Sequence, residues 1–173
     1  RADPTLYMQT HVAENRAEVL WVRELFPEAR SYLDVYARAG LLHARSVLAH
    51  GIWIDDADRA ALKSSGAQLA HSPSSNLFLG SGLFDWRAAD AAGAAVSLAS
   101  DVGGGTSLSM VRTMAEAYKV QAMAGQRLTA WKAGTVRAIW LQRSSCLALA
   151  ARSLRSRRNE WRIRAKQISA GRR

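Results

Sequence analysis

The feature that most constrains the fold is an alternation of four short apolar runs with stretches that favour helices. The apolar runs span residues 6–12, 46–50, 67–71 and 95–100. Strands that alternate with helices predict βαβ units, in which the strands run parallel. Four such units make about half of an eight-stranded (β/α)8 barrel. We therefore expect an α/β fold, a partial TIM barrel.

Capping residues and apolar spacing predict the helices between these runs. Asn15 and Glu18 have the spacing of a capping box, and the helix that follows should end before Pro27. Its buried face is predicted to carry Ala17, Leu20, Trp21 and Leu25. Further helices are expected over 30–38, from the cap Asp55 to Gly66, over 85–92, and from about Ser107 to Ala124.

Each apolar run ends at or beside a residue that can bind a metal or transfer a proton. His11, His50 and His71 lie at the first three ends, and Asp101 follows the fourth run by one residue. In a barrel of this kind the chemistry lies at the C-terminal ends of the strands, so the recurrence favours an active site. Glu14 follows His11 in His-x-x-Glu spacing, although its position before a helix cap is also a structural explanation. His71 precedes a Pro-Ser-Ser-Asn turn, where bracing a loop is an alternative to catalysis.

The glycine run in SDVGGGTS, residues 100–107, has two interpretations. Three glycines could cradle a phosphate, but their spacing matches neither a P-loop nor G-x-G-x-x-G. A helix capped by Thr106 or Ser107 explains them more simply.

Charge divides the chain into two segments. The net charge is +10. Residues 1–133 hold 13 basic and 13 acidic residues, whereas residues 134–173 hold 11 basic residues and one acid. We expect a partial barrel domain over 1–133 and a basic, arginine-rich tail over 134–173. The tail could bind phosphates in a salt-sensitive way, but it contains no nucleic-acid-binding motif, so nucleic acid is not the expected partner.

Several stretches resemble guanine deaminases of the amidohydrolase superfamily. They are QTHVAEN (9–15), VLAHGIW (47–53), AHSPSSNLFLGSGLF (70–84) and SDVGGGTSLSM (100–110). The resemblance runs from about residue 5 to 133 and implies roughly strands 5–8 of the barrel. Another aminohydrolase or a chlorohydrolase on the same barrel is the alternative, and the loop after Asp101 argues against it.

The resemblance implies a role for each residue at the strand ends. His11 and Asp101 would bind one zinc ion, and Asp101 would also orient the nucleophilic water. Glu14 would be the general acid and base and would contact the substrate, and His50 would lie beside the metal-bound water and the substrate. Zinc lowers the pKa of bound water to about 7, and a carboxylate can carry its proton to the substrate nitrogen. Hydrolysis of guanine would then yield xanthine and ammonia.

The resemblance also implies that part of the site lies outside this chain. The family's H-x-H motif, which supplies two more zinc ligands, is absent from these 173 residues. We expect a fragment that covers the C-terminal half of the barrel and is inactive alone, with a tail translated out of frame. Intact relatives are expected to be homodimers. A single cysteine and the lack of a signal peptide or of a run of ~20 apolar residues predict a cytoplasmic protein without a membrane span.

Overall fold

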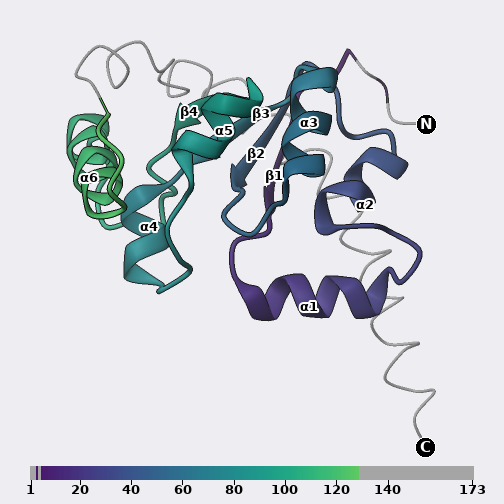
Figure 1. Ribbon diagram of the computed structural model, residues 1–173, viewed down its shortest axis with the longest axis horizontal. Coiled ribbons are helices and arrows are strands. Elements are labelled where there is room, and N and C mark those ends of the chain that lie inside the picture. The colour runs from purple at the N-terminus through teal and green to yellow at the C-terminus, as the bar shows by residue number, and fades with distance from the viewer. Residues whose placement is uncertain (1–2, 4, 129–173) are drawn as a thin grey trace, which may run out of the picture. The chain divides into compact units, whose positions relative to one another are not determined.

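The computed structural model describes residue 3 and residues 5–128, in which strands and helices alternate (Figure 1). The elements are β1 (Met8–Val12), α1 (Arg16–Leu25), α2 (Tyr32–Arg38), β2 (Ser46–His50), α3 (Asp56–Ser65), β3 (Gln68–His71), α4 (Pro73–Phe78), α5 (Trp86–Ala92), β4 (Ala95–Leu98) and α6 (Met110–Met123). The predicted tail over 134–173, its reading frame and the boundary at residue 133 lie outside the described residues.

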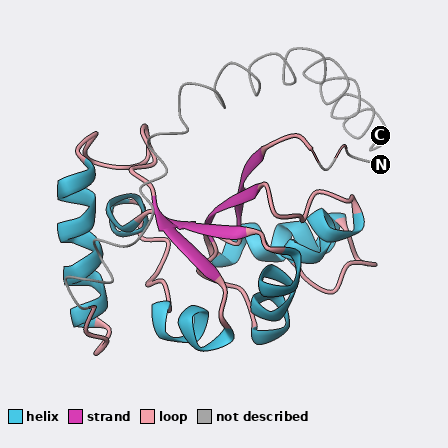
Figure 2. Ribbon diagram, turned by 90° about the horizontal axis from the view of Figure 1, so that it is seen from above, coloured by secondary structure: helices cyan, strands magenta, loops and turns pink. Residues whose placement is uncertain are grey.

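The four strands form one parallel sheet in the order β1-β2-β3-β4 (Figure 2). All four apolar runs are therefore strands of the α/β fold that the sequence predicts. Thr10, Leu48, Leu69 and Val96 lie side by side across the sheet. On this face Leu48 and Leu69 are fully buried in a core that also includes Leu62 of α3 and Trp86 of α5. Among the described strands β1 and β4 each pair on one side only, as expected for part of a barrel.

The helix caps follow the sequence closely. Asn15 Oδ1 accepts a hydrogen bond from the Glu18 N–H, and α3 begins at the cap Asp55 and ends at Gly66. One detail of the first cap is different, since Glu18 Oε2 accepts from the Glu14 N–H at 3.0 Å rather than from Asn15. The Glu18 side chain thereby ties the helix start to a predicted site residue.

The predicted buried face of α1 is wrong. Leu20, Trp21 and Leu25 are exposed, and the helix packs through Val22 and the partly buried Val19. Both faces of this helix carry apolar residues, so periodicity alone selected the wrong one.

Two further helix predictions are corrected by the structure. The segment after His71 is not only a turn: Pro73 begins the short helix α4, because proline suits the first helical position. The last helix begins at Met110 and is capped by Ser109, not by Thr106 or Ser107. The glycines at 103–105 are therefore not explained by a helix cap. Within the described part of the chain, no helix is long and apolar enough to cross a membrane.

Candidate active site

Three residues from three strand ends converge at one edge of the sheet. His11 Nε2 lies 3.6 Å from Asp101 Oδ1, and His50 Nε2 lies 3.8 Å from Asp101 Oδ2. The two imidazole rings stack with their centroids 5.1 Å apart. One ligand atom from each of the three residues lies within 4.8 Å of the others, close enough for one metal ion to contact all three. The structure thus brings together His11, His50 and Asp101, as the sequence predicts for strand ends of a parallel sheet.

An unusual backbone conformation makes this convergence possible. His11 lies opposite Ala49 in the sheet, so by simple alternation the side chain of His50 would point to the other face. His50 has a φ of 68°, and relative to an extended strand this turns its Cβ roughly half a turn about the N–Cα bond. Among the described residues, the only other non-glycine residues with positive φ are Asp101, which belongs to the cluster, and Ala13, which precedes Glu14. Such conformations cost about 1–3 kcal/mol each and concentrate at functional sites.

Glu14 completes the cluster from the turn between β1 and α1. Its Oε2 lies 3.7 Å from His50 Nε2, and its side chain is 18% exposed. Its other oxygen, Oε1, accepts a hydrogen bond from Ser81 Oγ at 3.1 Å. The two carboxylate oxygens therefore have different surroundings, and Oε2 is the one that faces the histidines.

The glycine run shapes the loop that carries Asp101. A Cβ at Gly104 would lie 2.7 Å from Ser75 Oγ and 2.9 Å from Asp101 Oδ2, and a Cβ at Gly105 would lie 1.8 Å from the Ser100 carbonyl oxygen. The N–H groups of both glycines donate to the Asp101 carbonyl oxygen. Glycine is therefore required here because the loop folds back tightly on Asp101.

His71 does not join the cluster. It is fully buried and stacks on Phe84 at 4.8 Å, with the edge of Trp86 at 5.8 Å. Neither of its ring nitrogens has a hydrogen-bond partner among the described residues. Burial, with a smaller contribution from the charge of His50, lowers the pKa of His71 to about 3. His71 therefore contacts Phe84 and Trp86 through its ring and makes no hydrogen bond to the loop after β3, so the described contacts are those of a packing residue rather than of the loop brace or the catalytic residue that the sequence left open.

Two residues of the site have no counterpart in the sequence prediction. Asn76 Oδ1 lies 2.8 Å from His50 Nδ1, and Ser81 holds Glu14 as described above. Both lie in the segment after β3: Asn76 is the last residue of the Pro-Ser-Ser-Asn sequence that was interpreted as a turn, and Ser81 lies five residues beyond it. Recognising Pro73 as the first residue of a helix would have placed Asn76 one turn into that helix, near the strand ends.

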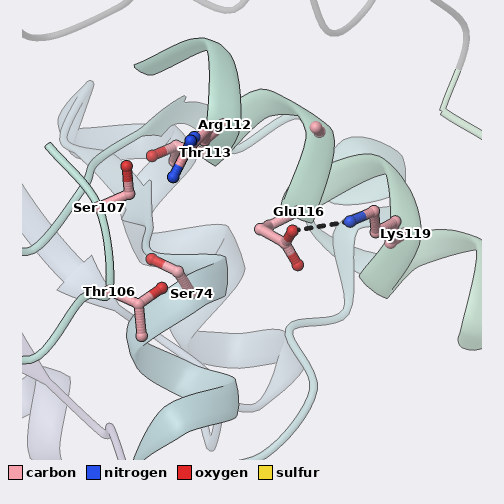
Figure 3. Close-up of a pocket in the computed structure, with 8 residues that line it drawn as sticks. Ser74, Thr106, Ser107, Arg112, Thr113, Glu116 and Lys119 are labelled. Atoms are coloured by element: carbon pink, nitrogen blue, oxygen red, sulfur yellow. Dashed lines mark hydrogen bonds and ion pairs between the residues drawn. The ribbon is translucent and has the colours of Figure 1, made fainter. Parts of the chain in front are cut away.

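The described domain also has a separate polar hollow of about 370 Å³ between α4 and α6. Figure 3 shows the side chains around it, with Glu116 and Lys119 joined by an ion pair at 2.9 Å. The residues that line it are Ser74, Thr106, Ser107, Arg112, Thr113, Ala115, Glu116 and Lys119. None of the predicted site residues is among them, so this hollow is distinct from the histidine cluster.

The donor set of the cluster fits a divalent transition metal. Two imidazoles and a carboxylate are ligands that zinc commonly takes in catalytic sites. His50 Nε2 is buried and has no hydrogen-bond partner among the described residues. Glu14 and Asp101 place two carboxylates beside it, and no lysine or arginine of the described part is ion-paired with either. The surplus negative charge and the unpartnered nitrogen both suit a cation.

Comparison with known proteins assigns the family. The model of the amidohydrolase family matches residues 2–136, and the chain belongs to this family. The barrel that the strand pattern predicts is the fold of the solved enzymes it resembles, and the four described strands form part of it.

The most similar proteins include several guanine deaminases. The guanine deaminase of Escherichia coli is 38% identical over 130 residues, which are 75% of this chain and 30% of that protein. A probable guanine deaminase of Deinococcus radiodurans is 44% identical over 123 residues, which are 71% of this chain and 28% of that protein. The chain thus spans under a third of the length of these relatives.

Solved structures agree with this similarity. The E. coli guanine deaminase structure superposes with a TM-score of 0.75 and 38% identity, covering 77% of this chain and 31% of that one. The guanine deaminase of C. acetobutylicum, solved with guanine bound in its active site, gives a TM-score of 0.72 and 27% identity, covering 76% of this chain and 33% of that one.

Proposed function

We propose that this chain carries part of the active site of a guanine deaminase, which hydrolyses guanine to xanthine and ammonia with one zinc ion. The observation that carries the proposal is the convergence of His11, His50 and Asp101 within 4.8 Å, with Glu14 Oε2 beside them. The similarity to guanine deaminases, one of them solved with guanine bound, supports the choice of substrate.

His11 Nε2 and Asp101 are the proposed metal ligands, and His50 Nε2 lies at the same centre. When bound, zinc would polarise a water molecule and bring its pKa close to neutrality. Side chains of the protein would carry out the other steps, namely proton transfer and the positioning of water and substrate. His11 is 58% exposed and Asp101 20% exposed, so solvent reaches both side chains in the described part of the chain.

Glu14 is the proposed proton carrier. Its Oε2 would accept the proton that the attacking water loses and would deliver a proton to a nitrogen of guanine. As the water oxygen adds to C2, its first proton passes through Glu14 to the ring nitrogen N3. Its second proton then passes through Glu14 to the exocyclic nitrogen, the bond from C2 to that nitrogen breaks, and ammonia leaves with the electron pair while the oxygen stays on C2 as a carbonyl. Ser81 keeps Oε1 occupied, so that Oε2 is free for this exchange. His50 would hold the water and the substrate through Nε2.

A chimera tests the proposal. Residues 5–128 would replace the matching segment of the E. coli guanine deaminase, so that the remaining two thirds of a known enzyme complete the barrel. We expect the chimera to convert guanine to xanthine and to bind one zinc ion. A folded, zinc-loaded chimera that leaves guanine unchanged but hydrolyses another amino- or chloro-substituted heterocycle would assign the chain to a different enzyme of the family.

A further inference from the structure

The side chain of Asn76 is buried next to His50 on a backbone held by hydrogen bonds. Asn76 is 2% exposed and His50 is fully buried. The Asn76 N–H donates to the Ser72 carbonyl oxygen, and the Asn76 carbonyl oxygen accepts from the Ser81 N–H. The backbone on both sides of the carboxamide is therefore fixed, and its oxygen lies 2.8 Å from His50 Nδ1.

This contact determines which nitrogen of His50 carries the proton. A carboxamide oxygen can only accept hydrogen bonds, so a bond between Asn76 Oδ1 and Nδ1 requires that Nδ1 donates. In a neutral imidazole the proton on one nitrogen leaves a lone pair on the other. The lone pair then lies on Nε2, the atom that faces the carboxylates of Glu14 and Asp101.

The surroundings of Nε2 agree with this assignment. The nearest oxygens of Glu14 and Asp101 lie 3.7 and 3.8 Å away, beyond hydrogen-bond distance, so neither accepts a hydrogen bond from Nε2 in this geometry. Nε2 has no partner among the described residues. A lone pair there is available to a metal ion or to a proton of water or substrate.

We propose that Asn76 is a positioning residue of the site: its side-chain oxygen holds the proton on His50 Nδ1 and keeps the Nε2 lone pair directed at the cluster of His11 and Asp101. The contribution of Asn76 to catalysis rests on the proposed function. The tautomer itself is a property of the chain and can be measured without metal or guanine. If the carboxamide were turned over, its NH2 group would donate to Nδ1 and the proton would move to Nε2, which could then bind no metal.

The test is 15N solid-state NMR of the full chain with labelled histidine, which requires no particular oligomeric state. The chain has four histidines, so the imidazole signals are few. The signal that is lost in a His50→Gln variant is the signal of His50. At about pH 9, well above the ordinary histidine pKa of ~6.5, we expect a protonated Nδ1 and a bare Nε2 on His50. A protonated Nε2 in the unsubstituted chain would overturn the inference.

Three variants separate positioning from general stability. Asn76→Asp keeps the accepting oxygen, so the His50 tautomer should be retained. Asn76→Leu removes it, and His50 should then show the mixture of tautomers typical of an unconstrained imidazole. Gln121→Leu is the matched control, because Gln121 is a fully buried amide that bonds the Phe84 carbonyl oxygen away from the site.

The results that would refute the role of Asn76 differ from those that would refute the proposed guanine deaminase activity. An unchanged His50 tautomer in Asn76→Leu would contradict the inference, as would a shift in Gln121→Leu. If Asn76→Leu fails to fold, the unsubstituted chain and Asn76→Asp still decide, since both must show the Nδ1-protonated form. A chimera that ignores guanine while His50 has the expected tautomer would refute the proposed substrate and leave the role of Asn76 standing.

Discussion

Ser81 and Glu14 lie 67 residues apart in the sequence and are joined by a hydrogen bond of 3.1 Å, with Ser81 Oγ donating to Glu14 Oε1. Ser81 is 5% exposed, so the bond is largely shielded from water. Its effect is to occupy one oxygen of the proposed proton carrier and to leave the other facing His50. The loop after β3 therefore orients a side chain that the turn after β1 supplies.

Replacing this hydroxyl should impair catalysis more than substrate binding. In the chimera, Ser81→Ala removes a hydrogen bond to a charged group, and such bonds contribute about 1.5–3 kcal/mol. We expect kcat for guanine to fall roughly tenfold or more, with a smaller change in KM, because Glu14 loses its fixed orientation. Steady-state kinetics of guanine hydrolysis measure both constants.

Ser64→Ala is the matched control for Ser81→Ala. Ser64 is an exposed serine of α3 whose hydroxyl bonds the Ala61 carbonyl oxygen of its own helix. Its removal should leave kcat unchanged. Equal kinetics for the two alanine variants would show that Ser81 does not orient Glu14.

The ion pair between Arg30 and the buried Asp58 should help to hold α3 against the segment before α2. Asp58 is 3% exposed, and it bonds the Arg30 guanidinium and the Ser31 hydroxyl. Arg30→Met leaves this carboxylate buried without its cation, which costs several kcal/mol in a fully buried pair. Because the Arg30 side chain is 45% exposed and water can compensate in part, we expect the free energy of unfolding to fall by about 2 kcal/mol.

Urea unfolding of the chain measures this loss, and Lys119→Met provides the comparison. Lys119 is 66% exposed and pairs with Glu116 within α6, so its removal should change the free energy of unfolding by less than ~0.5 kcal/mol. If the two variants are equally stable, the pair between Arg30 and Asp58 is not a significant stabilising contact.

Buried His71 should make the fold sensitive to acid. Its pKa is lowered to about 3 in the folded chain, from an ordinary value of 6.5. Below about pH 6.5 the unfolded chain takes up a proton on this residue and the folded chain does not, so stability falls as the pH is lowered toward 3. The loss is ~1.4 kcal/mol for each pH unit in that window.

Denaturant unfolding at several pH values between about 7 and 4 tests this dependence against His71→Leu. The variant has no proton to take up at this position, so its stability should fall less steeply with acid. The difference between the two slopes isolates His71 from the carboxylates, which titrate in both chains. Parallel curves would show that His71 is protonated in the folded state as readily as in the unfolded state.

The sequence predicts the sheet well because its strands carry strong local signals. The run SVLAH, for example, forms β2 over the expected residues, and Asp55 and Gly66 bound α3 as expected. The strand ends also indicated His11, His50 and Asp101, since the ends of parallel strands meet at one edge.

What the sequence could not predict depends on backbone conformation and on distant contacts. The positive φ of His50 turns its ring toward His11, and no local sequence pattern predicts that a histidine adopts this left-handed backbone conformation. The bonds from Asn76 to His50 and from Ser81 to Glu14 join segments 26 and 67 residues apart. The exposed face of α1, which includes Trp21, was predicted to be buried because apolar residues occur on both faces of the helix.

The most direct test of the proposed active site is the Glu14→Gln variant of the chimera, measured for zinc content and for guanine turnover in the same preparation. Glutamine preserves the shape of the side chain but cannot carry the proton. We predict that one zinc ion remains bound and that kcat falls by ~100-fold or more, the usual contribution of a general acid–base group. Turnover within about threefold of the unsubstituted chimera, with zinc retained, would contradict the role of Glu14.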